Sequence, residues 1–216
     1  MTGLKKKQKR LFIGICNSQE RIPSKFFWSF YNLRPVCPME VVRATHPWDV
    51  VRNNQLIQAF LRSECTIFAK MDVDQQYPAD YLEKMIPLVD EYKVVGPLIY
   101  DRWRNNDFMP LMFSRVAYPR LKKLEGWKRD SGVLEVPYAH TNLFVAREVW
   151  ENVPKPWYEA HLRWDGLQRD NHVDFDVLDK IKKAGYPIHI NTDVVVEHLT
   201  EQPVDVAFYD RWNSQE

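Results

Sequence analysis

A short apolar segment that ends in two acids constrains this chain more than any other feature. Residues Cys65–Met71 read CTIFAKM, an apolar and partly β-branched run too short for a helix, which predicts a buried strand. Asp72 and Asp74 follow directly, and side chains two residues apart on an extended chain project to the same side. Pro78 then ends the pairing. We therefore expect two carboxylates close together at the carboxyl end of a central strand.

These two acids admit a metal-binding and a structural interpretation. Neighbouring carboxylates repel each other unless a cation lies between them, and oxygen ligands suit Mg²⁺ or Mn²⁺ bound together with substrate phosphates. Asp also hydrogen-bonds to nearby backbone at the start of loops, so a purely local role stays open. A calcium loop is rejected, because Tyr77 and Pro78 stand where its glycine is needed and a strand precedes the acids. Our hypothesis is a metal–diphosphate site at the edge of a sheet.

Length and composition predict one globular domain over residues 1–216. The 30 Lys and Arg against 29 Asp and Glu give a net charge of +1, so overall charge selects no class of partner. The chain is 45% hydrophobic with only 7 Gly, which excludes disordered and fibrous classes. The three cysteines form no CxxC pair, which argues against a disulfide framework or structural zinc and for a reducing compartment.

No segment reaches the length of a membrane span, and a strand-like segment rather than a signal-peptide core follows KKKQKR. We therefore expect a soluble, cytoplasmic protein.

Strands and helices alternate over the first half of the chain. This order predicts a largely parallel sheet that binds ligands at the carboxyl ends of its strands. The predicted strands are Leu11–Cys16, Met39–Ala44, Cys65–Met71 and Val94–Tyr100, and the predicted helices are Ser24–Leu33, a segment after Thr45-His46-Pro47 with apolar residues at helical spacing, and Asp80–Glu91.

The second half opens differently. Asp101–Asp130 lacks clear periodicity, is rich in aromatic residues and carries eight Lys and Arg against four Asp and Glu, which indicates a long functional loop. After it we predict strands Val133–Val136, Asn142–Ala146, Ile188–Asn191 and Asp193–Val196, and helices Arg147–Val153 and Val173–Ala184.

The order of these parts resembles a GT-A fold nucleotide-sugar glycosyltransferase, close to the family 2 type. The resemblance covers residues 11–198 and rests on FIGICN, VVRNNQLIQAF, FAKMDVDQQYP, YAHTNLFVAREVWENVPKPW and HVDFDVLDKIKKAGYPIHINTDVVVEH. It implies an α/β, three-layer α/β/α fold with a mixed, mostly parallel central sheet. Residues 11–100 would form the nucleotide-sugar-binding half and 101–198 the acceptor-binding half, between a basic leader (1–10) and a C-terminal tail (199–216).

The resemblance also implies roles for individual residues. Asp72 and Asp74 match the DxD acids, which bind the metal and the ribose, and His198 matches the histidine that completes the coordination of Mn²⁺ or Mg²⁺. Arg52 and Asn53 match an Arg-Asn pair on the donor side. Asn17 follows the first predicted strand, where a polar group could meet the nucleotide base. A nucleoside-diphosphate sugar is then the donor.

The catalytic base is where this chain departs from the family pattern. Inverting members carry Glu-Asp before the Phe that opens the closing helix, but Asn171 and His172 stand at those positions ahead of Phe175. Asp170, His172 and Asp174 remain as candidates for the base, and each could instead cap or start the helix. A retaining mechanism, which needs no such base, stays open.

The acceptor is predicted only by class. Exposed aromatic side chains bind sugars or unstacked bases, although most could lie in the core; the candidates are Trp103, Trp127, Trp157 and Trp164. The basic excess in 101–130 favours an anionic acceptor, and a hydroxylated base in DNA, as in viral DNA-modifying glucosyltransferases, stands beside a glycan.

Two rival functions explain the sequence less completely. A nucleotidyltransferase that makes sugar nucleotides needs a glycine-rich phosphate loop after the first strand, whereas FIGICNSQERIP has one Gly. A non-catalytic carbohydrate- or nucleic-acid-binding module explains the aromatic residues but not the acids at the end of the strand.

Overall fold

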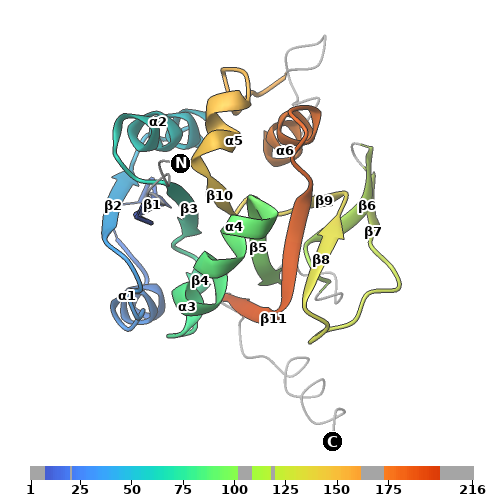
Figure 1. Ribbon diagram of the computed structural model, residues 1–216, viewed down its shortest axis with the longest axis horizontal. Coiled ribbons are helices and arrows are strands. Elements are labelled where there is room, and N and C mark those ends of the chain that lie inside the picture. The colour runs from blue at the N-terminus through green and yellow to red at the C-terminus, as the bar shows by residue number, and fades with distance from the viewer. Residues whose placement is uncertain (1–7, 20, 102–108, 118–119, 162–172, 200–216) are drawn as a thin grey trace, which may run out of the picture.

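The structure is a computed structural model of the chain, and it describes residues 8–19, 21–101, 109–117, 120–161 and 173–199. A central sheet lies between two layers of helices (Figure 1). The sheet is eight-stranded, in the order β2-β1-β3-β10-β5-β11-β4, with β8 paired to β11. Its strands are β1 (Leu11–Cys16), β2 (Met39–Ala44), β3 (Ile67–Asp72), β4 (Gln75–Gln76), β5 (Val94–Ile99), β8 (Val133–Val136), β10 (Phe144–Ala146) and β11 (Ile188–His198).

The sheet is mixed and mostly parallel, as predicted. β2, β1, β3, β5 and β11 run in one direction, whereas β10, β8 and β4 run against their neighbours. Because the parallel strands share a direction, the carboxyl ends of β1 and β3 meet side by side, with Cys16 opposite Asp72 in the register. The acidic segment therefore lies at the sheet edge where α/β folds bind ligands.

Alternation along the strands explains the three layers. Phe12 and Phe68 contribute to the core under α2 (Asp49–Arg62), α5 (Arg147–Asn152) and α6 (Val173–Lys183). Leu11 and Ile67 face the other way, toward α1 (Ser24–Tyr31), α3 (Tyr81–Met85), the 3₁₀ helix η1 (Ile86–Leu88) and α4 (Val89–Tyr92). In the described part of the chain, no helix has the length and apolarity needed to cross a membrane.

Two predicted elements differ in outline. The single helix expected over Asp80–Glu91 is divided into α3, η1 and α4, because Pro87 lacks the N–H that a continuous helix requires. The two strands expected at Ile188–Asn191 and Asp193–Val196 are one strand, β11, whose register against β5 shifts between Asn191 and Val195. This irregular strand pairs with β8 near its start and with β4 at its end.

The prediction of an irregular loop over Asp101–Asp130 is wrong for part of that stretch. β6 (Met112–Ala117) and β7 (Arg120–Lys123) form an antiparallel pair, and β6 also pairs with β9 (Tyr138–Ala139) in a second sheet. The pairing with β9 spans more than twenty residues of sequence, so local periodicity did not reveal it. Residues 102–108 of the expected loop lie outside the described residues.

Candidate functional site

A cavity of about 560 Å³ lies at the carboxyl ends of β1 and β3. Segments far apart in sequence line it: the ends of both strands, the first turns of α2 and α6, the segment 140–142 and the end of β11. The predicted site residues that the structure describes all lie in this lining: Asn17, Arg52, Asn53, Asp72, Asp74, Asp174 and His198. Asp170 and His172 lie outside the described residues.

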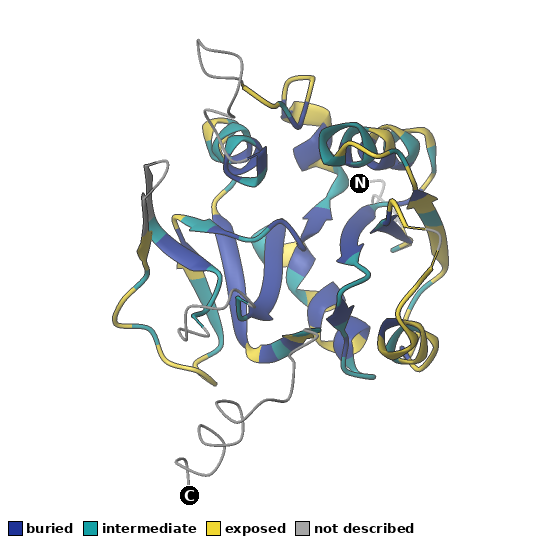
Figure 2. Ribbon diagram, turned by 180° about the vertical axis from the view of Figure 1, so that it is seen from behind, coloured by how far each residue is buried: buried dark blue, intermediate teal, exposed yellow. Residues whose placement is uncertain are grey.

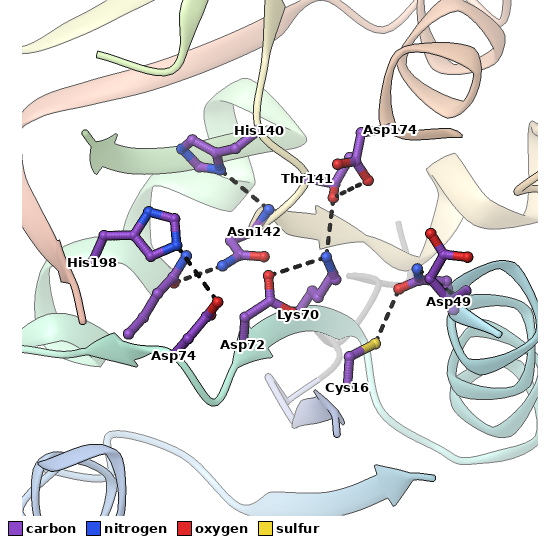
Figure 3. A network of polar contacts seen from close by, with 12 residues as sticks. Cys16, Asp49, Lys70, Asp72, Asp74, His140, Thr141, Asn142, Asp174 and His198 are labelled. Carbon is purple, nitrogen blue, oxygen red and sulfur yellow. Dashed lines mark hydrogen bonds and ion pairs between the residues drawn. The ribbon is translucent and has the colours of Figure 1, made fainter. Parts of the chain in front are cut away.

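Asp74 and His198 lie next to each other in the lining of the cavity (Figure 3). The imidazole Nε2 of His198 lies 3.6 Å from Asp74 Oδ2, and its Nδ1 lies 3.1 Å from the carbonyl oxygen of Tyr100. A carbonyl oxygen only accepts hydrogen bonds, so we infer that Nδ1 carries the proton in the neutral ring. Nε2 then presents its lone pair toward Asp74. A carbonyl partner of this kind is what orients a metal-binding histidine.

Asp72 lies against a buried lysine, Lys70, that no sequence motif identifies as part of the site. Lys70 Nζ is 3.3 Å from Asp72 Oδ2 and 3.1 Å from Thr141 Oγ1, and Thr141 in turn donates a hydrogen bond of 2.9 Å to Asp174 Oδ1 (Figure 3). Lys70 and Asp72 are two residues apart on β3 and so share a side of the strand. The network therefore links the DxD segment to the candidate base on α6.

Burial and the charges of neighbouring side chains shift the pKa values of the residues in this network. Burial acts to lower the pKa of Lys70, but the carboxylates of Asp72 and Asp174 outweigh it and hold that pKa well above its usual value. Burial also raises the pKa of Asp72, which Lys70 opposes and the nearby Asp74 reinforces. Cys16 has its pKa raised to about 11, chiefly by burial, so its thiol stays protonated and is no nucleophile at neutral pH.

The expected metal ligands fit only in part. An oxygen of Asp74 and a nitrogen of His198 lie close enough to bind the same metal ion. One oxygen of Asp72, in contrast, is paired with Lys70. In the described residues, a set of three groups with ligand atoms within 4.8 Å of one another occurs elsewhere, at Glu159, His161 and Asp176. Lys180 already pairs with the two acids of that set. The three predicted ligands are thus neighbours in one cavity without forming such a set.

The donor-side residues lie on α2 and after β1. Arg52 donates to the carbonyl oxygens of His46 and Pro47, while its Nε is buried without a hydrogen-bond partner among the described residues. Asn53 accepts a hydrogen bond of 3.1 Å from the thiol of Cys16, which fixes α2 against the end of β1. A buried guanidinium N–H without a partner is a donor to which a bound anion could bind.

The segment 140–142 is held tightly against β5. The ring of His140 bonds to the Pro97 carbonyl at 2.8 Å and accepts from the backbone N–H of Asn142. Burial lowers the pKa of His140 to about 4, so the ring is neutral. Gly96 permits this approach, because a Cβ there would stand 2.6 Å from Leu143 Cδ2 and 3.2 Å from the Asn142 carbonyl oxygen. Thr141 is thereby positioned for its contacts with Lys70 and Asp174.

The tryptophans proposed to bind the acceptor differ in how far they are buried. Trp157 is buried in the core, so for this residue the core interpretation is correct and the acceptor role is not. Trp127 is partly buried against the same core, and Trp103 and Trp164 lie outside the described residues.

No protein-family model and no curated protein matches the chain. Solved structures do resemble it. A197 from STIV is 15% identical with a TM-score of 0.58, and the match covers 89% of this chain and 86% of that one. GalNAc-T7, solved with UDP, GalNAc and Mn²⁺, is 13% identical with a TM-score of 0.61 over 91% of this chain. S. aureus TarS 1–349 in complex with UDP-GlcNAc is 10% identical with a TM-score of 0.54 over 90% of this chain.

These likenesses establish the fold, since identities of this size carry no more than that. The α/β/α fold is the GT-A fold of GalNAc-T7 and TarS, as the resemblance implied. The chain spans 45% of the GalNAc-T7 chain and 59% of the TarS chain, about half of each.

Proposed function

We propose that this chain is a glycosyltransferase that moves a sugar from a nucleoside-diphosphate sugar to a hydroxyl acceptor. The observation that carries the proposal is the convergence of the described candidate residues in one cavity at the carboxyl edge of a GT-A sheet. They come from α2, α6 and β11 and from the carboxyl ends of β1 and β3 with the residues just after them, and no local feature of the sequence requires them to meet. The structures of GalNAc-T7 with UDP and Mn²⁺ and of TarS with UDP-GlcNAc support the same class of donor.

On the donor side, Asn17 and Arg52 would bind the nucleoside diphosphate. Asn17 is buried and accepts a hydrogen bond from the backbone N–H of Gln19, so its side chain is fixed at the end of β1. Arg52 would donate its unpaired Nε–H to a phosphate oxygen. A divalent cation held by Asp74 and His198 would neutralise the charge that develops on the leaving nucleoside diphosphate.

On the acceptor side, Asp174 is the base that the described geometry favours. Its carboxylate lines the cavity and is oriented by the hydroxyl of Thr141. Asp174 would take the proton of the acceptor hydroxyl as that oxygen attacks the anomeric carbon. The bond from this carbon to the phosphate oxygen breaks, and the electron pair leaves with the nucleoside diphosphate. This route inverts the configuration of the sugar.

The acceptor is a glycan hydroxyl or a hydroxylated base in DNA. Lys122 and Lys123 of β7 are exposed, which fits an anionic acceptor, but the positive charge of the chain as a whole is only +1. Labelled sugar transferred to duplex DNA with hydroxymethylated bases, and not to glycans, would identify DNA; the reverse result would exclude it.

The rival functions make different binding predictions. A nucleotidyltransferase would bind a nucleoside triphosphate with a sugar phosphate, although residues 16–19 are Cys-Asn-Ser-Gln and lack the glycines of a phosphate loop. A non-catalytic module would bind an acceptor-like ligand without any metal-dependent binding of a nucleotide.

A thermal-shift panel of UDP, GDP, CDP and dTDP sugars, each with and without Mn²⁺, tests the proposal. One nucleotide should raise the Tm in the presence of Mn²⁺, and Asp74→Ala should abolish that shift. Asp80→Ala is the matched control, because Asp80 is an acid of the same segment that pairs with Lys84 outside the cavity lining. No shift with any donor, or a shift that Asp74→Ala leaves intact, would overturn the assignment.

A further inference from the structure

Lys70 is a buried charge that the proposed transfer reaction does not yet use. It lies on β3, in the middle of the sheet, where the strands are largely buried (Figure 2). Among the described residues it is the one Lys, Arg, Asp or Glu that is buried, with 8% of its surface exposed. A buried ammonium group is destabilising unless its N–H donors are satisfied. The partners of Lys70 therefore indicate what it can bind.

The ammonium group of Lys70 has one donor more than the structure gives it acceptors. A lysine ammonium carries three N–H groups. Nζ lies 3.3 Å from Asp72 Oδ2 and 3.1 Å from Thr141 Oγ1, and within the described residues it has no third acceptor. Because Lys70 also lines the cavity, an oxygen atom of a bound ligand can accept the third hydrogen bond.

The charges around Lys70 favour a neutral acceptor. Burial acts to lower the pKa of Lys70, but the carboxylates of Asp72 and Asp174 outweigh burial and hold that pKa well above its usual value, so the ammonium stays charged. The two carboxylates also leave a net negative charge around it, which disfavours a phosphate as the third acceptor. A hydroxyl has no such cost. It can accept from Lys70 and donate its own hydrogen to a neighbouring carboxylate at the same time.

Lys70 lies between the two ends of the proposed reaction. Asp74 and His198 are the proposed ligands of the metal ion at the diphosphate, and Asp174 is the proposed base beside the acceptor hydroxyl. Figure 3 shows Asp74 and His198 toward one end of the polar network and Asp174 toward the other, with Lys70 between them and linked to Asp174 through Thr141. The sugar has to span the same interval, because it connects the diphosphate to the point of attack. Its hydroxyl groups are thus the ligand oxygens nearest to Lys70.

We propose, on the basis of the transferase function above, that Lys70 binds the sugar that is transferred and donates its third N–H to one hydroxyl oxygen of that sugar. The contacts with Asp72 and Thr141 fix the ammonium group before the donor binds, so little side-chain entropy is lost on binding. A donor that lacks this hydroxyl leaves a buried, charged N–H unpaired, which costs more than the hydrogen bond itself. Lys70 therefore determines which donor sugars the site accepts.

Calorimetry with UDP and UDP-glucose in the presence of Mn²⁺ tests the contact, or the matching pair if the thermal-shift panel selects another nucleotide. Lys70→Met should weaken the binding of UDP-glucose by at least about tenfold, the loss of a hydrogen bond to a charged group. It should bind UDP at least as tightly as the wild type, because UDP carries no transferred sugar. Lys84→Met is the matched control, since Lys84 pairs with Asp80 outside the cavity lining, and should change neither affinity.

A set of UDP-glucose analogues that each lack one ring hydroxyl identifies the group that Lys70 binds. One analogue should bind the wild type at least about tenfold more weakly than UDP-glucose. Lys70→Met should bind that analogue and UDP-glucose equally, because the partner of the missing hydroxyl is gone. The ligand and the side chain then form a double-mutant cycle, in which the two losses are not additive.

A double variant guards against a loss of folding in Lys70→Met. Lys70→Met/Asp72→Asn has no unpaired carboxylate at this position and should show the same equal binding of the analogue and UDP-glucose. Asp72→Asn alone keeps the ammonium group and should keep the preference for UDP-glucose. Circular dichroism at the temperature of the titrations checks that each variant is folded.

The outcomes separate this proposal from the transferase function on which it rests. If no nucleotide of the panel binds, both are overturned. If Lys70→Met weakens UDP and UDP-glucose by the same factor, Lys70 contacts the diphosphate rather than the sugar, and only the present proposal is overturned. Equal binding of every analogue to the wild type, or losses that simply add in the cycle, would overturn it as well.

Discussion

The ammonium group of Lys70 lies 3.3 Å from Asp72 Oδ2, in the lining of the cavity that also holds Asp74 and His198. Lys70 is buried, and its ion pair with Asp72 offsets part of the repulsion among Asp72, Asp74 and Asp174, three of the four aspartates that line this cavity with Asp49. A divalent cation bound at Asp72 would be repelled by this ammonium group. Asp74 and His198 are therefore better placed than Asp72 to bind a metal.

Replacing Lys70 should leave the partly buried carboxylate of Asp72 without its ion-pair partner. We expect Lys70→Met to lower the free energy of unfolding by about 3 kcal/mol at pH 7, because Asp72 loses its partner and Thr141 loses a donor. Asp72→Asn in the same background should recover part of that loss. Urea unfolding of the two single variants and the double variant measures the coupling. Strictly additive losses would mean that the ion pair contributes nothing to stability.

The contact between His198 and Asp74 predicts that both residues contribute to metal binding. His198→Ala and Asp74→Ala should each weaken the Mn²⁺-dependent binding of the donor nucleotide by at least about tenfold in calorimetry. His46→Ala is the control, because the His46 ring bonds to the backbone N–H of Trp48 and does not line the cavity. If Asp72→Ala weakened Mn²⁺ binding while these two variants did not, the metal would lie on the Lys70 side instead.

Asp174 should affect the rate of transfer more than donor binding. Asp174→Asn should lower kcat by about 10²- to 10⁴-fold with little change in the affinity for the donor nucleotide, as expected for a lost general base. Asp179→Asn alters the same helix at a residue that pairs with Tyr138 and Lys182, outside the cavity lining, and should keep full activity. Nuclear magnetic resonance of the product should reveal an inverted anomeric centre. Retention would remove Asp174 from the role of base.

Much of the fold is predictable because its strands are short apolar segments that can be recognised from their own sequence. The bounds predicted for Leu11–Cys16, Met39–Ala44 and Val133–Val136 agree with β1, β2 and β8. The hairpin of β6 and β7 is not predicted, since its own sequence shows no clear alternation and β6 also pairs with β9, more than twenty residues away. The break at Pro87 was a readable signal that the prediction of one helix overlooked.

The site was predictable to the level of residue type and position along the chain, but its internal contacts were not. Asp72 and Asp74 are predicted from their place after a strand and His198 from the resemblance to the glycosyltransferase family, and the structure puts all three in one cavity. Lys70 lies inside the apolar run of the predicted strand, so the pattern does not identify it as a site residue. Its position two residues before Asp72 was the available signal, since alternation places both side chains on one side of β3. Thr141 gave no such signal, because its contacts with Lys70 and Asp174 depend on the tertiary fold.

His140 predicts how stability depends on pH. Burial lowers its pKa from 6.5 to about 4, so the folded state holds the ring neutral while the unfolded state binds a proton below pH 6.5. The stabilisation from a neutral His140 is thus fully present above pH 6.5 and is lost as the pH falls toward 4, by about 3 kcal/mol at 1.4 kcal/mol for each pKa unit. Lys70, Asp174 and His198 also act on this ring, so their titration has to be separated from its own. Urea unfolding between pH 7 and 4 should show a steeper loss for the wild type than for His140→Gln, which cannot take up the proton; equal slopes would mean that other groups carry the acid sensitivity.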